Sequence, residues 1–362
     1  MIPVMRPKLP AAERLKPYLQ AIDASRIYTN FGPLVCAFEG RLVEHFGLAE
    51  GMVTTVGNAT LGLSLALAAQ GARPGTLCAM PAWTFVASAH AATVAGLVPY
   101  FIDVDADSWA VDPDEIEDMI IGAPGEVGAV MPVMPFGRPI DVAAWDRFHT
   151  RSGVPVVIDA AAGFDAITPG AVPVVVSLHA TKILGVGEGG LVMSTERALI
   201  HEIRIRSSFG FAGSRQAMRP AMNAKLSEFH AAVGLAGFDE WSVARAEWME
   251  AARRYRGRLA DSNLVRLQHG FGGDWIAATC NVSMSKLGAL EGQALLAEIG
   301  IETRRWWDDG AHRHPATESF PKAPLPTTEA LASSTIGLPF YRELDSATID
   351  RICDRVLMLA GD

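Results

Sequence analysis

Residues 156–193 read VVIDAAAGFDAITPGAVPVVVSLHATKILGVGEGGLVM, and this stretch decides the fold. Three short apolar runs, each typical of a buried strand, alternate here with turns rich in small residues. The first run ends in Asp159, and the second, Val174–Val176, is followed closely by Lys182. The glycine-rich turn at 187–190 then leads into the third run. Two ionisable side chains at the ends of neighbouring buried strands make this stretch the candidate functional centre.

Outward from this stretch, strand-like runs alternate with helical patterns up to about residue 195. This alternation predicts an α/β fold whose largely parallel sheet is covered by helices on both faces. Ligands of such sheets bind beyond the carboxyl ends of the strands, where Thr60, Phe85 and Asp159 are all predicted to lie. The predicted strands are 52–56, 77–80, 99–104, 127–133, 156–159, 174–176 and 191–193, with helices at 61–68, 86–95 and 142–150.

A chain of 362 residues is long enough for two domains. A long helical pattern covers 226–259, and we place the domain change inside it, near Gly237. The predicted units are a large domain, 1–237, and a small C-terminal domain, 238–362, which ends in an amphipathic helix at 346–359. The N-terminal segment is a candidate to pack on the small domain.

Composition excludes several classes of partner. The formal net charge of −9 argues against nucleic acid, because phosphate binding needs a basic face. The four cysteines form no CxxC pair, which favours free thiols in a reducing compartment, and no metal-site spacing is recognisable. No apolar run approaches the roughly 18 residues of a membrane span. The expectation is a cytoplasmic protein with no membrane partner and no metal.

The chemistry of Lys182 and Asp159 suits a carbonyl cofactor with a pyridine ring. A Schiff-base lysine must be held by a constrained loop, and Lys182 lies between a strand and a glycine-rich turn. A buried carboxylate at Asp159 is costly without a partner, and a protonated pyridine nitrogen would supply one and act as an electron sink. The ordinary alternatives are a solvated surface lysine and an aspartate that caps a helix beginning at 160–162.

Other residues near predicted strand ends fit the same cofactor. The small residues Asn58–Thr60 open a helix whose free backbone N–H groups could hold a phosphate, or they are an ordinary cap. Ser177 and His179 could donate to a phosphate or orient a substrate, although serine there is also common turn chemistry. Phe85 or Trp83 could cover one ring face, or simply pack in the core.

Taken together, the pattern resembles the sugar aminotransferases of the DegT/DnrJ/EryC1/StrS family, which are fold type I pyridoxal-phosphate enzymes. The similarity runs over roughly residues 5–355. The matching segments are GPLVCAFE at 32–39, NATL at 58–61, PAWTFVA at 81–87, DAAA at 159–162, VSLHATK at 176–182, GEGG at 187–190, MNAKLSE at 222–228, and Thr303, Arg304 and His312.

The resemblance implies a large cofactor-binding domain with a seven-stranded type of sheet and a smaller C-terminal α/β domain. It implies that Lys182 forms the Schiff base with pyridoxal 5'-phosphate and shuttles the proton, that Asp159 holds the pyridine nitrogen, and that Phe85 stacks on the ring. The implied phosphate contacts are Asn58, Ala59, Thr60, Ser177 and Asn223 of the partner subunit.

The implied activity is transfer of an amino group, from L-glutamate, to a keto carbon of a nucleotide-linked deoxysugar for surface-polysaccharide or secondary-metabolite synthesis. The enzyme would be a homodimer with active sites at the subunit interface. Candidate substrate contacts are His179, Arg215, Arg219, Arg304 and His312, although the loop 207–222 could equally be a solvated basic loop. The alternatives are amination of a cyclitol ketone, loss of a sugar hydroxyl, and a non-catalytic regulator that binds the cofactor.

Three residues depart from the family pattern. Ala162 replaces a Gln or His that contacts the hydroxyl side of the cofactor ring, Met134 replaces a histidine, and Ala59 replaces a glycine of the phosphate turn. The substrate pocket is therefore expected to differ in detail. Lys182 itself matches the transaminases and not the family's dehydratases, which carry histidine there.

Overall fold

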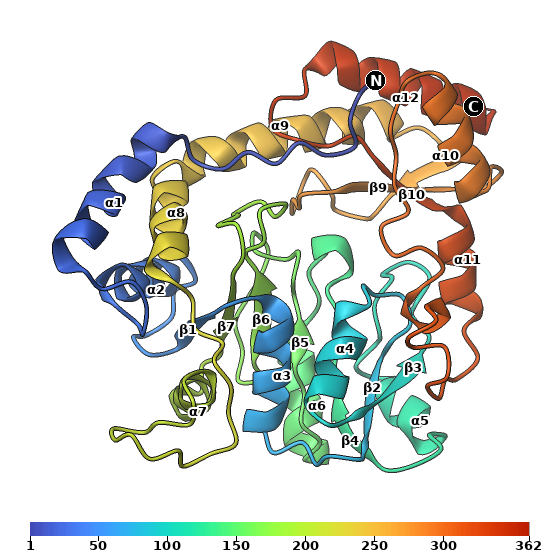
Figure 1. Ribbon diagram of the computed structural model, residues 1–362. Coiled ribbons are helices and arrows are strands. Elements are labelled where there is room, and N and C mark those ends of the chain that lie inside the picture. The colour runs from blue at the N-terminus through green and yellow to red at the C-terminus, as the bar shows by residue number, and fades with distance from the viewer. Residues whose placement is uncertain (362) are drawn as a thin grey trace.

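The computed structural model describes residues 1–361 and contains one large sheet with helices on both faces (Figure 1). The strands of this sheet are β1 (Val53–Val56), β2 (Leu77–Pro81), β3 (Val98–Ile102), β4 (Val127–Val130), β5 (Ile158–Asp159), β6 (Val174–Ser177) and β7 (Gly190–Met193). One part has the order β3-β2-β4 and the other β5-β6-β7-β1. Parallel bridges from Val130 to Val156 and from Val133 to Asp159 join the two parts into a single layer.

The pairing within this layer is mainly parallel, as the sequence predicts. Strand β2 pairs in parallel with both β3 and β4, and β5 pairs in parallel with β6. Only β7 runs against its neighbours, β6 and β1. All of these strands therefore end near one edge except β7, which begins there at Gly190, directly after the glycine-rich turn.

Both faces of the sheet are buried, which explains its nearly continuous apolar runs. Val157, Val175 and Val192 belong to the core on the side of α3 and α4, whereas Ile158 and Val174 belong to the core on the opposite side. The helices of this region are α1 (Ala12–Ser25), α2 (Pro33–His45), α3 (Ala59–Ala69), α4 (Ala87–Val94), α5 (Ile116–Ile121), α6 (Val142–Ser152), α7 (Arg197–Ser207) and α8 (Glu228–Asp239), with a 3-10 turn at Pro135–Gly137.

The helical pattern predicted at 226–259 is formed by two helices, α8 and α9 (Trp241–Leu259). The hydroxyl of Ser227 caps α8 by accepting from the N–H of His230, and non-helical backbone at Glu240 separates α8 from α9. Continuous periodicity hid this break, because neither glycine nor proline marks it. The break lies three residues from Gly237, and the domain boundary placed there stays a prediction.

A second, antiparallel sheet lies above the first, with the order β10-β9-β8 (Figure 1). Helices α9 and α12 pack against each other beside it. Its elements are β8 (Val265–Leu267), β9 (Cys280–Met284), α10 (Ala289–Glu298), a 3-10 turn at Ala311–Arg313, α11 (Pro326–Ser334), β10 (Thr335–Leu338) and α12 (Ser346–Ala360).

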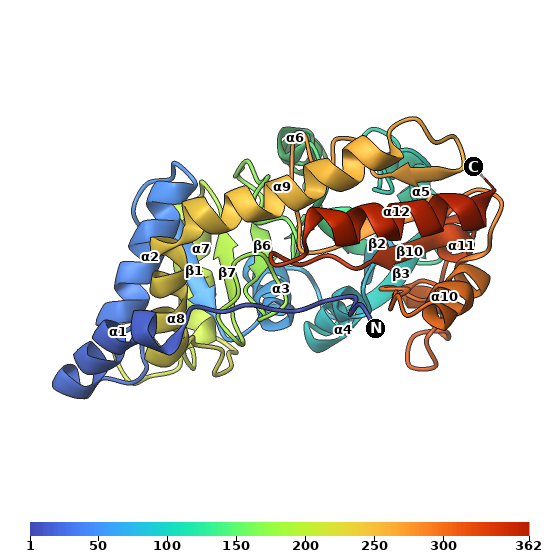
Figure 2. The ribbon, with the colours of Figure 1, turned by 90° about the horizontal axis from the view of Figure 1, so that it is seen from above.

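Two segments tie this upper unit to the rest of the chain. The N-terminal segment runs alongside α9 and α12 (Figure 2), where Ile2 bridges Ile301 and the carbonyl of Val4 accepts from the N–H of Phe340. A second segment, 311–323, returns to the large sheet and pairs with the outer side of β3 through Phe101.

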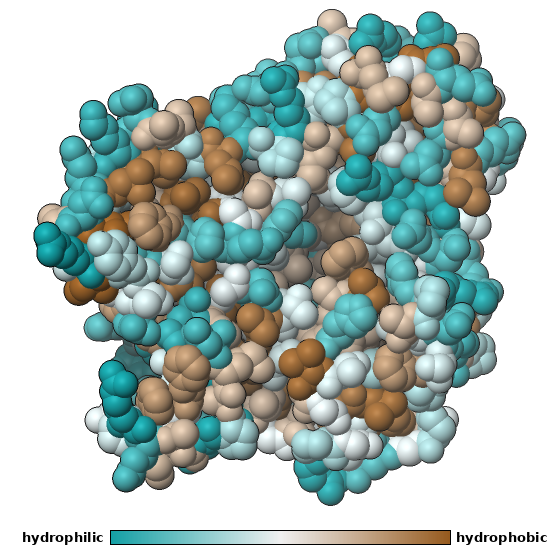
Figure 3. Space-filling model, in the orientation of Figure 1, coloured by the Kyte–Doolittle hydropathy of each residue, from teal (hydrophilic) through white to brown (hydrophobic). Residues whose placement is uncertain are grey.

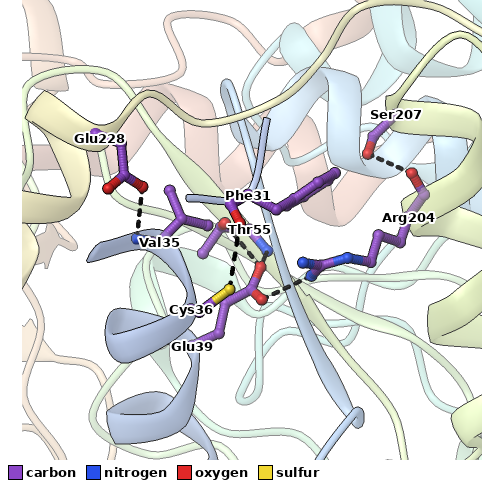
Figure 4. Close-up of polar contacts among 8 residues, drawn as sticks. All are labelled: Phe31, Val35, Cys36, Glu39, Thr55, Arg204, Ser207 and Glu228. Atoms are coloured by element: carbon purple, nitrogen blue, oxygen red, sulfur yellow. Dashed lines mark hydrogen bonds and ion pairs between the residues drawn. The ribbon is translucent and has the colours of Figure 1, made fainter. Parts of the chain in front are cut away.

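A buried carboxylate fixes β1 between two helices (Figure 4). Glu39 of α2 is 8% exposed and accepts from both the N–H and the hydroxyl of Thr55, at 2.8 and 2.9 Å. It also pairs with Arg204 of α7 at 2.7 Å, and that guanidinium lies over the ring of Phe31. The cluster therefore anchors β1 to α2 and α7.

Within residues 1–361, none of the helices combines the length and the apolar composition that crossing a bilayer requires. The cysteines are free thiols; Cys78, Cys280 and Cys353 are buried, and Cys36 is exposed.

Candidate active site

A cavity of about 400 Å³ opens beyond the carboxyl ends of the large sheet, beneath the upper unit. Figure 3 shows this region as a hollow between the two halves of the molecule. The cavity brings together many of the predicted site residues from four separate segments of the chain. These are Asn58, Ala59, Thr60, Phe85, Asp159, Ala162, Ser177, His179 and Lys182.

Asp159 ends β5 and is 5% exposed. One carboxylate oxygen accepts from the hydroxyl of Ser88 at 2.7 Å, and the other accepts from the N–H of Ala161 at 3.1 Å. Residues 160–162 form a turn, so Asp159 does not cap a helix. Burial raises the pKa of this carboxyl, and the Ser88 hydrogen bond, the Ala161 N–H and the charge of Lys182 act against that rise.

Lys182 follows β6 in a tight loop held by backbone hydrogen bonds from its own N–H to His179 and from Ala180 to Gly187. Burial lowers the pKa of its ammonium group, and the charge of Asp159 opposes this shift. The amine is therefore neutral at a lower pH than that of a solvated lysine. A neutral amine is what a nucleophilic or proton-accepting lysine requires.

The N-terminus of α3 faces the same cavity. The Asn58 side chain caps the helix by accepting from the N–H of Leu61 at 2.9 Å, which leaves the first N–H groups, at Ala59 and Thr60, for a ligand. A Cβ at Gly190 would lie 2.8 Å from the Ala59 nitrogen, so only glycine lets β7 pass so close. The Ser177 hydroxyl, at the end of β6, lines the cavity as well. A helix start of this kind suits a phosphate.

His179 is oriented by its neighbours. Its Nδ1 lies 2.8 Å from the hydroxyl of Thr181, and its Nε2 lies 3.7 Å from the carboxylate of Glu188. Both partners also line the cavity. Phe85, at the mouth, is 56% exposed, so one face of its ring is open to stack on a flat ligand.

The opposite wall is apolar and was mostly missed by sequence reasoning. Met134 and Ala162, two of the departures noted above, lie there together, and the Cε and Sδ atoms of Met134 come within 2.9 Å of where a Cβ at Gly163 would be. Trp307 stacks on Phe136 with ring centroids 3.7 Å apart. The remaining members of this wall are Met5, Val133, Ala278 and Trp306. Local patterns could not show that Met5 or the two tryptophans reach the cavity, because they come from the N-terminal segment and the upper unit.

The basic loop after α7 does not reach this cavity within the chain. Arg215 and Arg219 are exposed, and Arg219 pairs with Glu202 at 3.1 Å. Asn223 is exposed as well, and its side-chain oxygen accepts from the ammonium of Lys225 at 2.6 Å. Their predicted roles would need a second copy of the chain.

Arg304 and His312 are also outside the cavity lining. Arg304 pairs with Glu302 at 3.2 Å and lies over the ring of Trp306. His312 is only 1% exposed and packs edge-on against Phe101, and neither ring nitrogen has a hydrogen-bond partner. The match at Thr303, Arg304 and His312 therefore supplies no contact to the cavity within this chain.

The donor set fits pyridoxal phosphate. The cavity presents a half-buried lysine, a buried carboxylate, an open aromatic face and a helix N-terminus, which match an aldehyde, a pyridine nitrogen, a ring and a phosphate respectively. Among residues 1–361, no three His, Cys, Asp or Glu side chains come close enough together to hold a metal ion.

Comparison with known proteins agrees with this geometry. The model of the DegT/DnrJ/EryC1/StrS aminotransferase family matches residues 11–357. Protein Rv3402c of Mycobacterium tuberculosis is 30% identical over 97% of this chain and 88% of its own length. The dTDP-4-amino-4,6-dideoxy-D-glucose transaminase of Shigella dysenteriae is 31% identical over 71% of this chain and 70% of its own.

Solved structures share the fold. The structure of DesI in the presence of its TDP-sugar product superposes with a TM-score of 0.89 at 29% identity, covering 99% of this chain and 93% of that one. Structures of similar fold also include a protein described as a PLP-dependent aminotransferase. The chain belongs to the DegT/DnrJ/EryC1/StrS aminotransferase family and is an aminotransferase whose cofactor is pyridoxal phosphate.

Proposed function

We propose that this aminotransferase moves an amino group from L-glutamate to a keto carbon of a nucleotide-linked deoxysugar. The observation that carries the proposal is the meeting of Lys182, Asp159 and the start of α3 in one cavity. Two similar proteins support the substrate class, one named for a dTDP-linked amino sugar and one solved with a TDP-sugar product.

Bound pyridoxal phosphate supplies an electron sink that stabilises negative charge on the substrate carbon. In the proposed site, Lys182 would hold the cofactor through its neutral amine, and its Nζ, when free, would accept and return a proton. Asp159 holds the pyridine nitrogen protonated, and Phe85 covers one face of the ring. The backbone N–H groups of Ala59 and Thr60, with the hydroxyl of Ser177, hold the phosphate.

The anionic parts of both substrates need positive charge that this cavity lacks. Of its lining residues, none is an arginine, and Lys182 is the only lysine. One proposed source is the exposed loop with Arg215 and Arg219, which in a homodimer would reach the neighbouring cavity together with Asn223 of the partner subunit. A second source lies within the chain, where Arg6, Lys8 and Arg342 line a small pocket that adjoins the cavity at Lys182. The first source, positive charge from a second chain, supports an active homodimer. We also propose, from the sequence, that the chain divides into two domains near Gly237 and that the protein is cytoplasmic.

The same lack of arginine favours one second candidate, a cyclitol ketone as the acceptor. A ring ketone without a diphosphate would leave no charge uncompensated on the apolar wall of Met134, Ala162 and Trp307. A nucleotide-linked ketosugar and a cyclitol ketone, offered separately to the amino form of the enzyme, would separate the two by their rates.

The visible absorption of purified protein incubated with pyridoxal phosphate tests the site. We expect a band from cofactor bound through Lys182, loss of that band in Lys182→Ala, and its bleaching by L-glutamate. Enzyme first converted to its amino form by L-glutamate and then freed of glutamate should aminate one ketosugar per site and stop. Protein that shows no band, or a Lys182→Ala variant that keeps it, would contradict the proposal.

A further inference from the structure

Two buried hydroxyl groups stand in line behind the Asp159 carboxylate. The Ser88 hydroxyl donates to one Asp159 oxygen at 2.7 Å, and the Thr84 hydroxyl lies 2.9 Å from the Ser88 oxygen. Ser88 is 0% exposed and Thr84 is 1% exposed. Ser88 is not part of the cavity lining, so it acts on a ligand there only through Asp159.

The direction of the hydrogen bonds in this chain follows from counting protons. An ionised carboxylate only accepts, and a hydroxyl group has one hydrogen to give. Since Ser88 gives its hydrogen to Asp159, the Ser88 oxygen must accept from Thr84. Both hydroxyl dipoles then point their positive ends at the carboxylate, which favours its charged form.

We propose that Ser88 and Thr84 are positioning residues that keep the Asp159 carboxylate ionised and turned toward the pyridine nitrogen of the cofactor. The proposal rests on the role assigned to Asp159 above. It adds two residues that lie 71 and 75 positions from Asp159 in the sequence. Ser88 lies outside every matched segment, and Thr84, although part of the PAWTFVA segment, was given no role there.

Few groups around Asp159 can keep its carboxylate ionised. Lys182 is the charged side chain that acts on it, and its charge lowers the carboxyl pKa, whereas burial, the largest effect, raises it. His179 and Glu188 are the other titratable groups of the cavity lining. The Ser88 hydrogen bond is the largest of the influences that oppose burial.

The same short segment also carries the stacking ring. Phe85 lies between Thr84 and Ser88 in the sequence, and its carbonyl accepts from the N–H of Ser88 at 3.1 Å. The hydrogen-bonded hydroxyls therefore hold the ring-covering residue and the ring-nitrogen partner in a common frame. One flat cofactor can contact both only if this frame is kept.

The decisive variant is Ser88→Ala in the cofactor-loaded enzyme. We expect the dissociation constant of pyridoxal phosphate to rise about tenfold or more, the typical effect of losing a hydrogen bond to a charged group. Removing a bond that lowers the Asp159 pKa lets that pKa rise. The loss of cofactor on acidification should then begin about one pH unit higher than in the unaltered enzyme.

Ser64→Ala is the matched control. Ser64 of α3 is also buried, and its hydroxyl lies 2.9 Å from the carbonyl of Ala91 and 3.1 Å from that of Thr60, with no contact to Asp159. This control should leave the pH of cofactor loss unchanged. Ser88→Thr, which keeps the hydroxyl, should lose cofactor at the same pH as the unaltered enzyme. Thr84→Val should raise the pH of cofactor loss, as Ser88→Ala does, but by less.

The role of the two hydroxyls would be overturned if the pH of cofactor loss were unchanged in both Ser88→Ala and Thr84→Val. It would also be overturned if Ser64→Ala shifted this pH as much as they do. If Ser88→Ala does not fold, the pH of cofactor loss in Thr84→Val decides, because valine keeps the shape of threonine without its hydroxyl. Thr84 also lines the cavity, so the deciding quantity is this pH, which reports on Asp159, and not the cofactor affinity alone. Unaltered protein that binds no pyridoxal phosphate would instead refute the proposed site itself, and the hydroxyl chain with it.

Discussion

Glu39 and Asp159 are both buried carboxylates, and they differ in whether their partners leave room for a ligand. Glu39 is 8% exposed and has three partners, the N–H and the hydroxyl of Thr55 and the guanidinium of Arg204. Asp159 is 5% exposed, accepts only from Ser88 and Ala161 within the protein, and faces a cavity. Burial alone therefore does not mark a functional carboxylate. A functional carboxylate is instead marked by having few partners within the protein and by facing a cavity that a ligand can fill.

The largest expected contrast is in activity. Asp159→Asn should lower the rate of amino transfer about 10²–10³-fold, because a preorganised charge beside the reacting system is lost. Glu39→Gln should leave the rate per folded, cofactor-loaded molecule nearly unchanged. Steady-state kinetics normalised to bound cofactor checks both. A large rate loss in Glu39→Gln at full cofactor occupancy would erase the distinction.

Stability should show the reverse order. Glu39→Gln should lower the free energy of unfolding by roughly 3 kcal/mol, the low end for breaking a buried pair, because Arg204 keeps part of its surface in water. Asp159→Asn should cost the cofactor-free protein nothing, since it removes a charge that burial disfavours. Urea denaturation of the cofactor-free variants measures the difference.

The pH dependence of stability sharpens the comparison for Lys182. Its pKa lies below 10.5 in the folded protein, so between those two values the unfolded chain binds more protons, and folding gains stability as pH rises. Cofactor-free Lys182→Met lacks this effect. Its free energy of unfolding should therefore exceed that of the unaltered protein most at pH values below the folded-state pKa of Lys182, as urea denaturation across pH would measure. The gap should close as pH approaches 10.5. A gap that does not change with pH would contradict the lowered pKa.

The smallest expected effects come from two threonines that serve the two carboxylates. Thr55→Val should cost about 1 kcal/mol of stability, the usual worth of one hydrogen bond, and leave cofactor binding unchanged. Thr84→Val should instead weaken cofactor binding. Denaturation and cofactor titration of both variants would show whether each threonine affects only its own carboxylate.

The sequence was sufficient for the parts of the site that local patterns carry. Asp159, Lys182 and the opening of α3 sit at the ends of apolar runs, where strand periodicity and turn residues place them. The exact break at Glu240 was not predicted, because helical periodicity continues across it and no side-chain cap opens α9.

Ser88 and the apolar wall were beyond local patterns for a different reason. Ser88 looks like any small residue in a helix, and its role depends on a contact with a residue 71 positions away. Trp306 and Trp307 reach the cavity only because the upper unit folds over the sheet. Arg304 and His312, which the family resemblance implies as substrate contacts, lie outside the cavity lining of this chain, and their role stays a prediction.

The returning segment 311–323 also bears on solubility. Phe101 of β3 receives a hydrogen bond from Ala323 at 2.9 Å and donates one to Pro321 at 3.0 Å, so this margin of the large sheet is already paired. An unpaired margin is a template for strand addition by another molecule, and hence for aggregation. A protease cut within this segment, although it alters no residue of the cavity, should therefore make the protein prone to associate through β3.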